Sequence, residues 1–94
     1  MESIMQSEKK CYLCGRNGSM DPLEQHHIFG GTNRKLSEQY GLKVWLCGDR
    51  CHRNGPEAVH KNKQVAAVLK AKGQIAFENY YDGNFLQIFG RNYK

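Results

Sequence analysis

Four cysteines, arranged as two close pairs, constrain the fold of this chain more than any other feature. Cys11 and Cys14 form a C-x2-C pair, and Cys47 and Cys51 form a C-x3-C pair much later in the chain. Structural Zn²⁺ takes four such ligands in a tetrahedron, which leaves no position open for a substrate. We therefore predict a structural zinc site whose formation is part of folding. Two disulfides, or four unrelated thiols, are the alternative.

Length and charge limit the remaining possibilities. The chain has 94 residues, enough for one domain with a modest core, and domains of this size often need a metal or disulfides. It has no apolar stretch of about 20 residues and no signal-peptide pattern, so we expect a cytoplasmic protein with no membrane partner. In a reducing compartment cysteines favour metal over disulfides. The net charge of +5 favours a polyanionic partner such as DNA.

The residue pattern predicts an α+β domain over residues 10–94, preceded by a flexible arm over residues 1–9. Residues 25–29 and 42–46 are the expected strands, ended by two glycines and by a cysteine respectively. Valines and Leu69 at approximate helical spacing predict a helix that begins near Glu57 and stops at Gly73. A second short helix is expected over residues 74–81, and the apolar C-terminal stretch is expected to pack back on the body.

The chain has only four histidines, and their placement predicts a catalytic site. His26 and His27 lie in the first expected strand, His52 follows Cys51 directly, and His60 is near the start of the expected helix. Neighbouring side chains on a strand point to opposite faces, so one of the pair can bind a metal while the other faces a substrate. Phosphodiester hydrolysis needs a base that titrates near neutral pH and a divalent ion, and histidines suit both needs. The alternative is a set of surface or supporting histidines.

Together these residues resemble the HNH endonucleases, also called His-Me finger or ββα-metal enzymes. The resemblance is carried by Cys11 and Cys14, by His26-His27-Ile28, and by the stretch from Leu46-Cys47 to Cys51-His52. It extends from about Lys10 to the C-terminus and is similar to small phage and prophage members with a four-cysteine zinc site. It implies a ββα-metal, treble-clef-like domain with C-terminal helices.

The resemblance also implies a role for each histidine. The family's general base corresponds to His27, and the metal ligand before it corresponds to His26. His52 and His60 are implied to complete the site of a catalytic divalent ion such as Mg²⁺, Mn²⁺, Ni²⁺ or Zn²⁺. The implied reaction is hydrolysis of DNA, by nicking or double-strand cleavage, that leaves a 5′ phosphate and a 3′ hydroxyl. Phage members act beside the packaging terminase, which makes terminase an implied partner in the host cell.

Two features depart from the family pattern. The family's Asn, which orients the base histidine, comes shortly before the third cysteine, but the stretch GLKVWLC contains no Asn. Asn33 and Asn54 are the nearby candidates for this role, and a backbone carbonyl is another. His52 and His60 are also further apart than the one-turn spacing common in the family. Both reach one ion only if the intervening segment loops out.

Basic residues flank the histidines in the sequence and are candidates for contacts with double-stranded DNA. They are Arg34, Lys35, Arg53, Lys61 and Lys63. Such residues bind phosphates without reading sequence, so we expect weak sequence preference and strong salt dependence. For any single residue among them, a solvated surface charge is the alternative.

Two other functions remain open at this point. The first is a non-catalytic zinc-binding module that docks on DNA or on a protein partner, which the missing Asn favours and the intact His26-His27 pair disfavours. The second is a disulfide-stapled binding domain, which the lack of a signal peptide disfavours.

Overall fold

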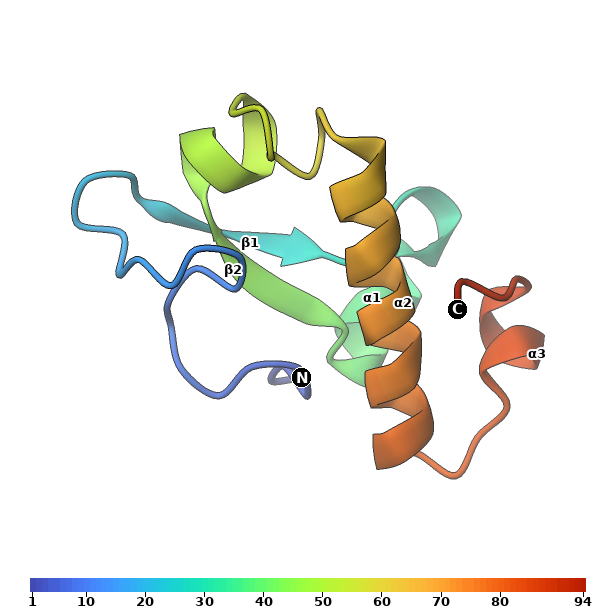
Figure 1. The fold of residues 1–94 in the computed structure, drawn as a ribbon. Coiled ribbons are helices and arrows are strands. Elements are labelled where there is room, and N and C mark those ends of the chain that lie inside the picture. The colour runs from blue at the N-terminus through green and yellow to red at the C-terminus, as the bar shows by residue number, and fades with distance from the viewer.

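The computed structural model describes residues 1–94 and confirms the predicted α+β class (Figure 1). In chain order the elements are β1 (Leu23–His27), a 3-10 turn (Gly31–Asn33), α1 (Arg34–Tyr40), β2 (Lys43–Cys47), a short π-helical turn (Gly48–Arg53), α2 (Lys63–Tyr80) and α3 (Phe85–Phe89). The two expected strands are present, with bounds shifted by one or two residues. None of the helices is long and apolar enough to cross a membrane.

The two strands form an antiparallel sheet that divides their side chains between two faces. His26 pairs with Val44, and His27 pairs with Lys43. Residues that pair directly share a face, and neighbours along a strand alternate. His26 therefore lies on the face that carries the buried Val44, while His27 lies on the opposite face with Lys43. The α2 helix crosses the sheet near the end of β1, as Figure 1 shows.

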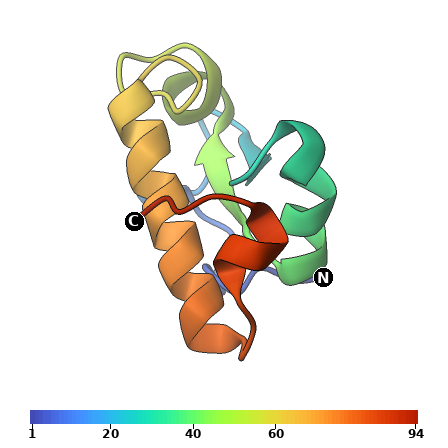
Figure 2. The same ribbon diagram turned by 90° about the vertical axis from the view of Figure 1, so that its right-hand side faces the viewer.

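An aromatic cluster joins the helices to the end of the sheet. Phe77 of α2 and Phe85 and Phe89 of α3 are buried, and Phe29 packs against both α3 residues with ring centroids 5.4 and 4.9 Å apart. Figure 2 shows α3 in front of the space between α1 and α2. The C-terminal stretch therefore packs back on the body, as its apolar residues predict.

The prediction of a helix that ends at Gly73 is wrong, because α2 continues through this glycine to Tyr80. The helix begins at Lys63, where the Asn62 side chain accepts hydrogen bonds from two backbone N–H groups of the first turn. A Cβ atom at Gly73 would lie 2.9 Å from Cγ2 of Ile28. Gly73 thus allows close packing of α2 on the end of β1, and the expected separate helix over residues 74–81 is its second half.

A short helix, α1, lies between the two strands, where the sequence pattern predicts no regular element. It ends at Gly41, whose φ of +72° favours glycine. The buried hydroxyl of Ser37 in α1 accepts a hydrogen bond from the Phe29 N–H at 2.9 Å and donates one to the Phe29 carbonyl at 3.0 Å. This pair of bonds fixes α1 beside the end of β1.

Residues 1–9, expected as a flexible arm, lie along the free edge of β2. The Ile4 N–H donates to the Gly41 carbonyl at 2.9 Å, and the Trp45 N–H donates to the Gln6 side-chain oxygen at 2.9 Å. The Ser3 hydroxyl donates to the Lys43 carbonyl at 2.6 Å. These contacts satisfy backbone groups that an exposed edge strand would otherwise present to other chains.

Candidate functional site

The four cysteine sulfurs gather at one place, as their spacing predicts. The thiols of Cys11, Cys14, Cys47 and Cys51 all lie within 4.8 Å of one another, and none forms a disulfide. Four sulfurs placed tetrahedrally at about 2.3 Å from zinc would be about 3.8 Å apart. The Cys14 and Cys47 sulfurs are 3.5 Å apart, which is close to this value. The cluster therefore has the composition and size of a zinc site.

Tight turns bring each pair of sulfurs together. The Gly15 N–H donates to the Cys11 carbonyl at 2.8 Å, and the Cys14 N–H points to the Cys11 sulfur at 3.5 Å. Gly15 has a φ of +80°, which explains why glycine follows this pair. In the second pair, Cys47 ends β2 and Cys51 lies in the π-helical turn that follows. Both are buried.

The thiols of this cluster differ in pKa because each is affected by burial and by the sulfurs beside it. Burial raises the pKa of Cys47, and the neighbouring Cys14 and Cys11 sulfurs raise it further. Together these effects bring it to about 12. Burial acts against ionisation at Cys14 too, but hydrogen bonds from the Arg16 backbone and the other thiols lower its pKa to about 6. Thiolates packed this closely repel one another unless a cation lies among them.

A second cluster consists of three histidines from three separate segments. His26 comes from β1, His52 from the π-helical turn, and His60 from the loop before α2. Each offers a ring nitrogen, and these nitrogens lie within 4.8 Å of one another. The Nε2 atoms of His52 and His60 are 3.1 Å apart. Two ligands at about 2.1 Å from one ion, separated by 90–110°, would be about 3.0–3.4 Å apart.

His60 reaches the cluster because the segment after His52 loops out. The Val59 N–H donates to the Cys51 carbonyl at 2.8 Å, and the His60 N–H donates to the His52 carbonyl at 3.1 Å. The returning chain is thus hydrogen-bonded to the second cysteine turn itself. This removes the spacing difficulty that the sequence raised, and both histidines can approach one ion.

Glu24 orients His52 from the same face of β1 that carries His26. Its Oε1 atom accepts a hydrogen bond from His52 Nδ1 at 2.8 Å, which leaves Nε2 with a free lone pair. The other carboxylate oxygen contacts Arg53. The hydrogen bond from His52 lowers the pKa of Glu24, against a smaller opposing effect of burial. The sequence analysis missed Glu24, although its position two residues before His26 places both on one face.

Two of the clustered histidines have lowered pKa values, which favour the neutral form that binds a metal. Burial, together with the charges of His52 and His60, lowers the pKa of His26 to about 3. Burial and the charge of His52 also lower the pKa of His60. Because a histidine ligand binds through a neutral ring, protons compete weakly for these two nitrogens near neutral pH.

The histidines open into a cavity of about 440 Å³. His26, His27, His52 and His60 all line it, with Arg34 from α1 and Lys70 from α2 on its walls. The cysteine cluster, by contrast, is mostly buried and lines no part of this cavity. The histidine cluster is therefore the one that a substrate can reach.

His27 stands apart from the three-histidine cluster. Its Nε2 atom donates to Glu38 Oε1 at 2.8 Å, and the Lys43 ammonium donates to the other Glu38 oxygen at 2.7 Å. Hydrogen bonds from Lys43 and His27 lower the pKa of Glu38 to about 2. An ionised Glu38 keeps the proton on Nε2, so that Nδ1 is the nitrogen able to accept a proton.

The two Asn candidates for orienting His27 do not contact it. The Asn33 amide donates to the Phe89 carbonyl at 3.4 Å, and the Asn54 amide donates to Asp49 at 2.7 Å. Glu38 takes the place predicted for them. Nothing in the local sequence indicates this role, because Glu38 and His27 meet only through the packing of α1 beside β1.

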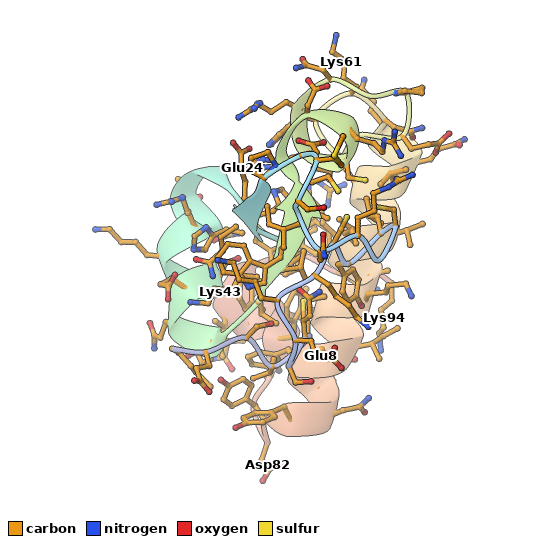
Figure 3. The ribbon with its side chains drawn as sticks, turned by 90° about the vertical axis from the view of Figure 1, so that its left-hand side faces the viewer. Glu8, Glu24, Lys43, Lys61, Asp82 and Lys94 are labelled. Atoms are coloured by element: carbon orange, nitrogen blue, oxygen red, sulfur yellow. The ribbon has the colours of Figure 1, made fainter.

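The predicted DNA-contacting residues are placed in different ways. Arg34 lines the histidine cavity, whereas Arg53 is paired with Glu24. Lys35, Lys61 and Lys63 are exposed, and Figure 3 shows Lys61 pointing outward at one end of the molecule. Lys70 is a cavity residue that the sequence analysis missed, because its helical position alone does not show which groups it faces.

Comparison with known proteins does not assign a family or a function to this chain. The chain matches no family model, no curated protein and no solved structure.

Proposed function

We propose that this protein is a metal-dependent DNA endonuclease of the HNH type. The observation that carries the proposal is the convergence of His26, His52 and His60 in an open cavity that is also lined by His27. The order of cysteine pair, antiparallel strands, second cysteine pair and long helix supports a treble-clef-like, ββα-metal fold. In a phage-type protein, the reaction would take place in the host cytoplasm, beside the packaging terminase.

In this proposal the three clustered histidines hold a divalent ion such as Mg²⁺, Mn²⁺, Ni²⁺ or Zn²⁺. When bound, such an ion polarises the scissile phosphate and stabilises negative charge on the leaving oxygen. Burial lowers the pKa of His26 to about 3, which favours its neutral form, and His52 is oriented by the carboxylate of Glu24. A set of imidazole ligands favours the transition metals over Mg²⁺.

His27 acts as the general base. It takes a proton from the attacking water at Nδ1, while Nε2 stays hydrogen-bonded to Glu38. The carboxylate of Glu38 stabilises the imidazolium that forms. Water attacks the phosphorus, the bond to the 3′ oxygen breaks, and this oxygen takes a proton from solvent water, so that the products carry a 5′ phosphate and a 3′ hydroxyl. Arg34 and Lys70 on the cavity walls bind the phosphate charge.

A non-catalytic zinc module that docks on DNA or on a protein is the second candidate function. The cysteine cluster alone supports it, because four thiolates that fill a tetrahedron do no chemistry on a substrate. Such a module has no need for a second, open set of metal ligands with an oriented fourth histidine beside it. The nuclease proposal accounts for both clusters.

Nicking of supercoiled plasmid by the purified, zinc-loaded protein tests the proposal, with each of the four ions added in turn. We expect nicking by the parent protein and strong loss of nicking in His27→Ala. Gln25→Ala, which alters another residue of the same cavity, is the matched control and should nick normally. Absence of nicking with every ion, or equal nicking by His27→Ala, would favour the docking module.

A further inference from the structure

A second cavity, of about 340 Å³, lies on α2 next to the histidine cavity. Ala66 and Lys70 line both cavities, so the two are adjacent along the helix. The other wall of the second cavity is the C-terminal segment, residues 91–94. A groove therefore runs from the histidines, across α2, to the end of the chain.

The second cavity is strongly basic. Four cationic side chains line it, namely Lys63, Lys70, Arg91 and Lys94, and no Asp or Glu side chain does. Only Lys94 is paired, with Glu78 at 2.7 Å. The remaining three positive charges face the groove without a partner of opposite sign. A concave surface lined by one sign of charge concentrates ligands of the opposite sign.

The C-terminal segment, residues 91–94, is held on α2 by hydrogen bonds and by packing of the Tyr93 ring. The buried side chain of Gln74 accepts a hydrogen bond from the Tyr93 N–H at 2.7 Å and donates one to Asn92 at 2.9 Å. The Tyr93 ring packs on Phe29 with centroids 4.9 Å apart. A buried glutamine that binds two groups of the segment holds it on α2.

Tyr93 in turn positions two of the cations. The Lys70 ammonium lies 5.7 Å from the centre of its ring, and the Arg91 guanidinium lies 5.4 Å from it. Contacts of cations with an aromatic ring at this range are attractive. The two charges are thereby held on the same side of α2, one of them also on the wall of the histidine cavity.

We propose that this second cavity binds the backbone of the DNA strand on one side of the cleaved phosphate. Lys70 lies between the two cavities, and Arg91 holds a phosphate further along the strand. The inference deepens the proposed nuclease function and rests on it for the identity of the ligand. It extends the phosphate-binding role of Lys70 to the second cavity and assigns a new binding role to Arg91 and the C-terminal segment.

The test is a binding measurement that does not depend on cleavage. Fluorescence anisotropy of a labelled DNA duplex, without added divalent ion, gives the affinity at salt concentrations from about 50 to about 200 mM. We expect Lys70→Gln and Arg91→Gln each to weaken binding and to reduce the salt slope by about 1. Lys72→Gln is the matched control, since Lys72 is exposed on the same helix and lines neither cavity.

The outcomes separate this inference from the proposed function. Unchanged DNA affinity and salt slope in both groove variants, or an equal effect of Lys72→Gln, would show that the second cavity does not bind DNA. Groove-dependent binding by a protein that never nicks plasmid would retain the groove and reject the nuclease. Thermal melting of each variant, with a midpoint close to that of the parent, excludes unfolding as the cause of weaker binding.

Discussion

The cysteine cluster and the histidine cluster are neighbours that differ in ligand type and in exposure to solvent. The first is built from four thiols, three of them buried, and a tetrahedral ion there would have no free position. The second is built from three imidazoles at the wall of an open cavity, which leaves room for water and substrate. The two clusters thus differ in exposure: the cysteine cluster is mostly closed to solvent, and the histidine cluster is open to it.

The two clusters are joined through two consecutive residues, Cys51 and His52. Each contributes a side chain to its own cluster, and each carbonyl accepts a hydrogen bond from the returning chain at Val59 or His60. Formation of the cysteine cluster therefore fixes the position of two of the three histidines.

Loss of the structural metal should have the largest effect. We expect Cys47→Ser, or removal of zinc by a chelator, to unfold the domain, because structural zinc in small domains contributes on the order of 10 kcal/mol. Circular dichroism and native mass spectrometry measure the fold and the bound zinc. In His60→Ala, by contrast, the fold and one tightly held zinc should remain. A folded, zinc-free Cys47→Ser protein would show that folding does not depend on the cysteine cluster.

Removal of a clustered histidine should abolish activity without unfolding. A catalytic ion supplies several kcal/mol of transition-state stabilisation, so we expect nicking by His26→Ala to fall at least about a hundredfold. The thermal midpoint should stay close to that of the parent. Full activity of this variant would show that the histidine cluster is not the reaction centre.

Loss of the carboxylate that orients His52 should have a smaller effect. We expect Glu24→Gln to weaken binding of a second metal ion by about 10- to 100-fold, because such partners fix the orientation of the ring they contact. Isothermal titration of the zinc-loaded protein with Ni²⁺ or Mn²⁺ measures this change. Glu57→Gln, at an exposed residue that lines neither cavity, is the control. Equal affinities would leave Glu24 with no positioning role.

The smallest effect is expected at Gly73, where α2 meets the end of β1. Alanine there would gain about 1 kcal/mol of helix propensity but would crowd Ile28 and Phe29, at a cost of about 1–3 kcal/mol. We expect Gly73→Ala to lower the free energy of unfolding by about 1 kcal/mol. Urea denaturation measures it, with Gly30→Ala as a control because a Cβ atom there meets nothing within 4 Å. A stabilised Gly73→Ala protein would contradict the close packing.

Local spacing in the sequence was sufficient for the features that act over a few residues. The two cysteine pairs predicted the four-thiol cluster, and strand alternation predicted that His26 and His27 face opposite sides. Both follow from backbone geometry, which acts between near neighbours in the chain. The sequence also predicted two strands, because their patterns are local.

Only the tertiary structure decided which distant side chains meet. His27 is hydrogen-bonded to Glu38, and not to an asparagine, because α1 packs beside β1, and Lys70 shares a cavity with the histidines because α2 crosses the sheet. Gly73 reads as a helix stop in isolation, yet it lies inside α2, where a neighbouring strand needs the space. Contacts between residues far apart in the chain depend on how whole elements pack, and local propensity carries no information about that packing.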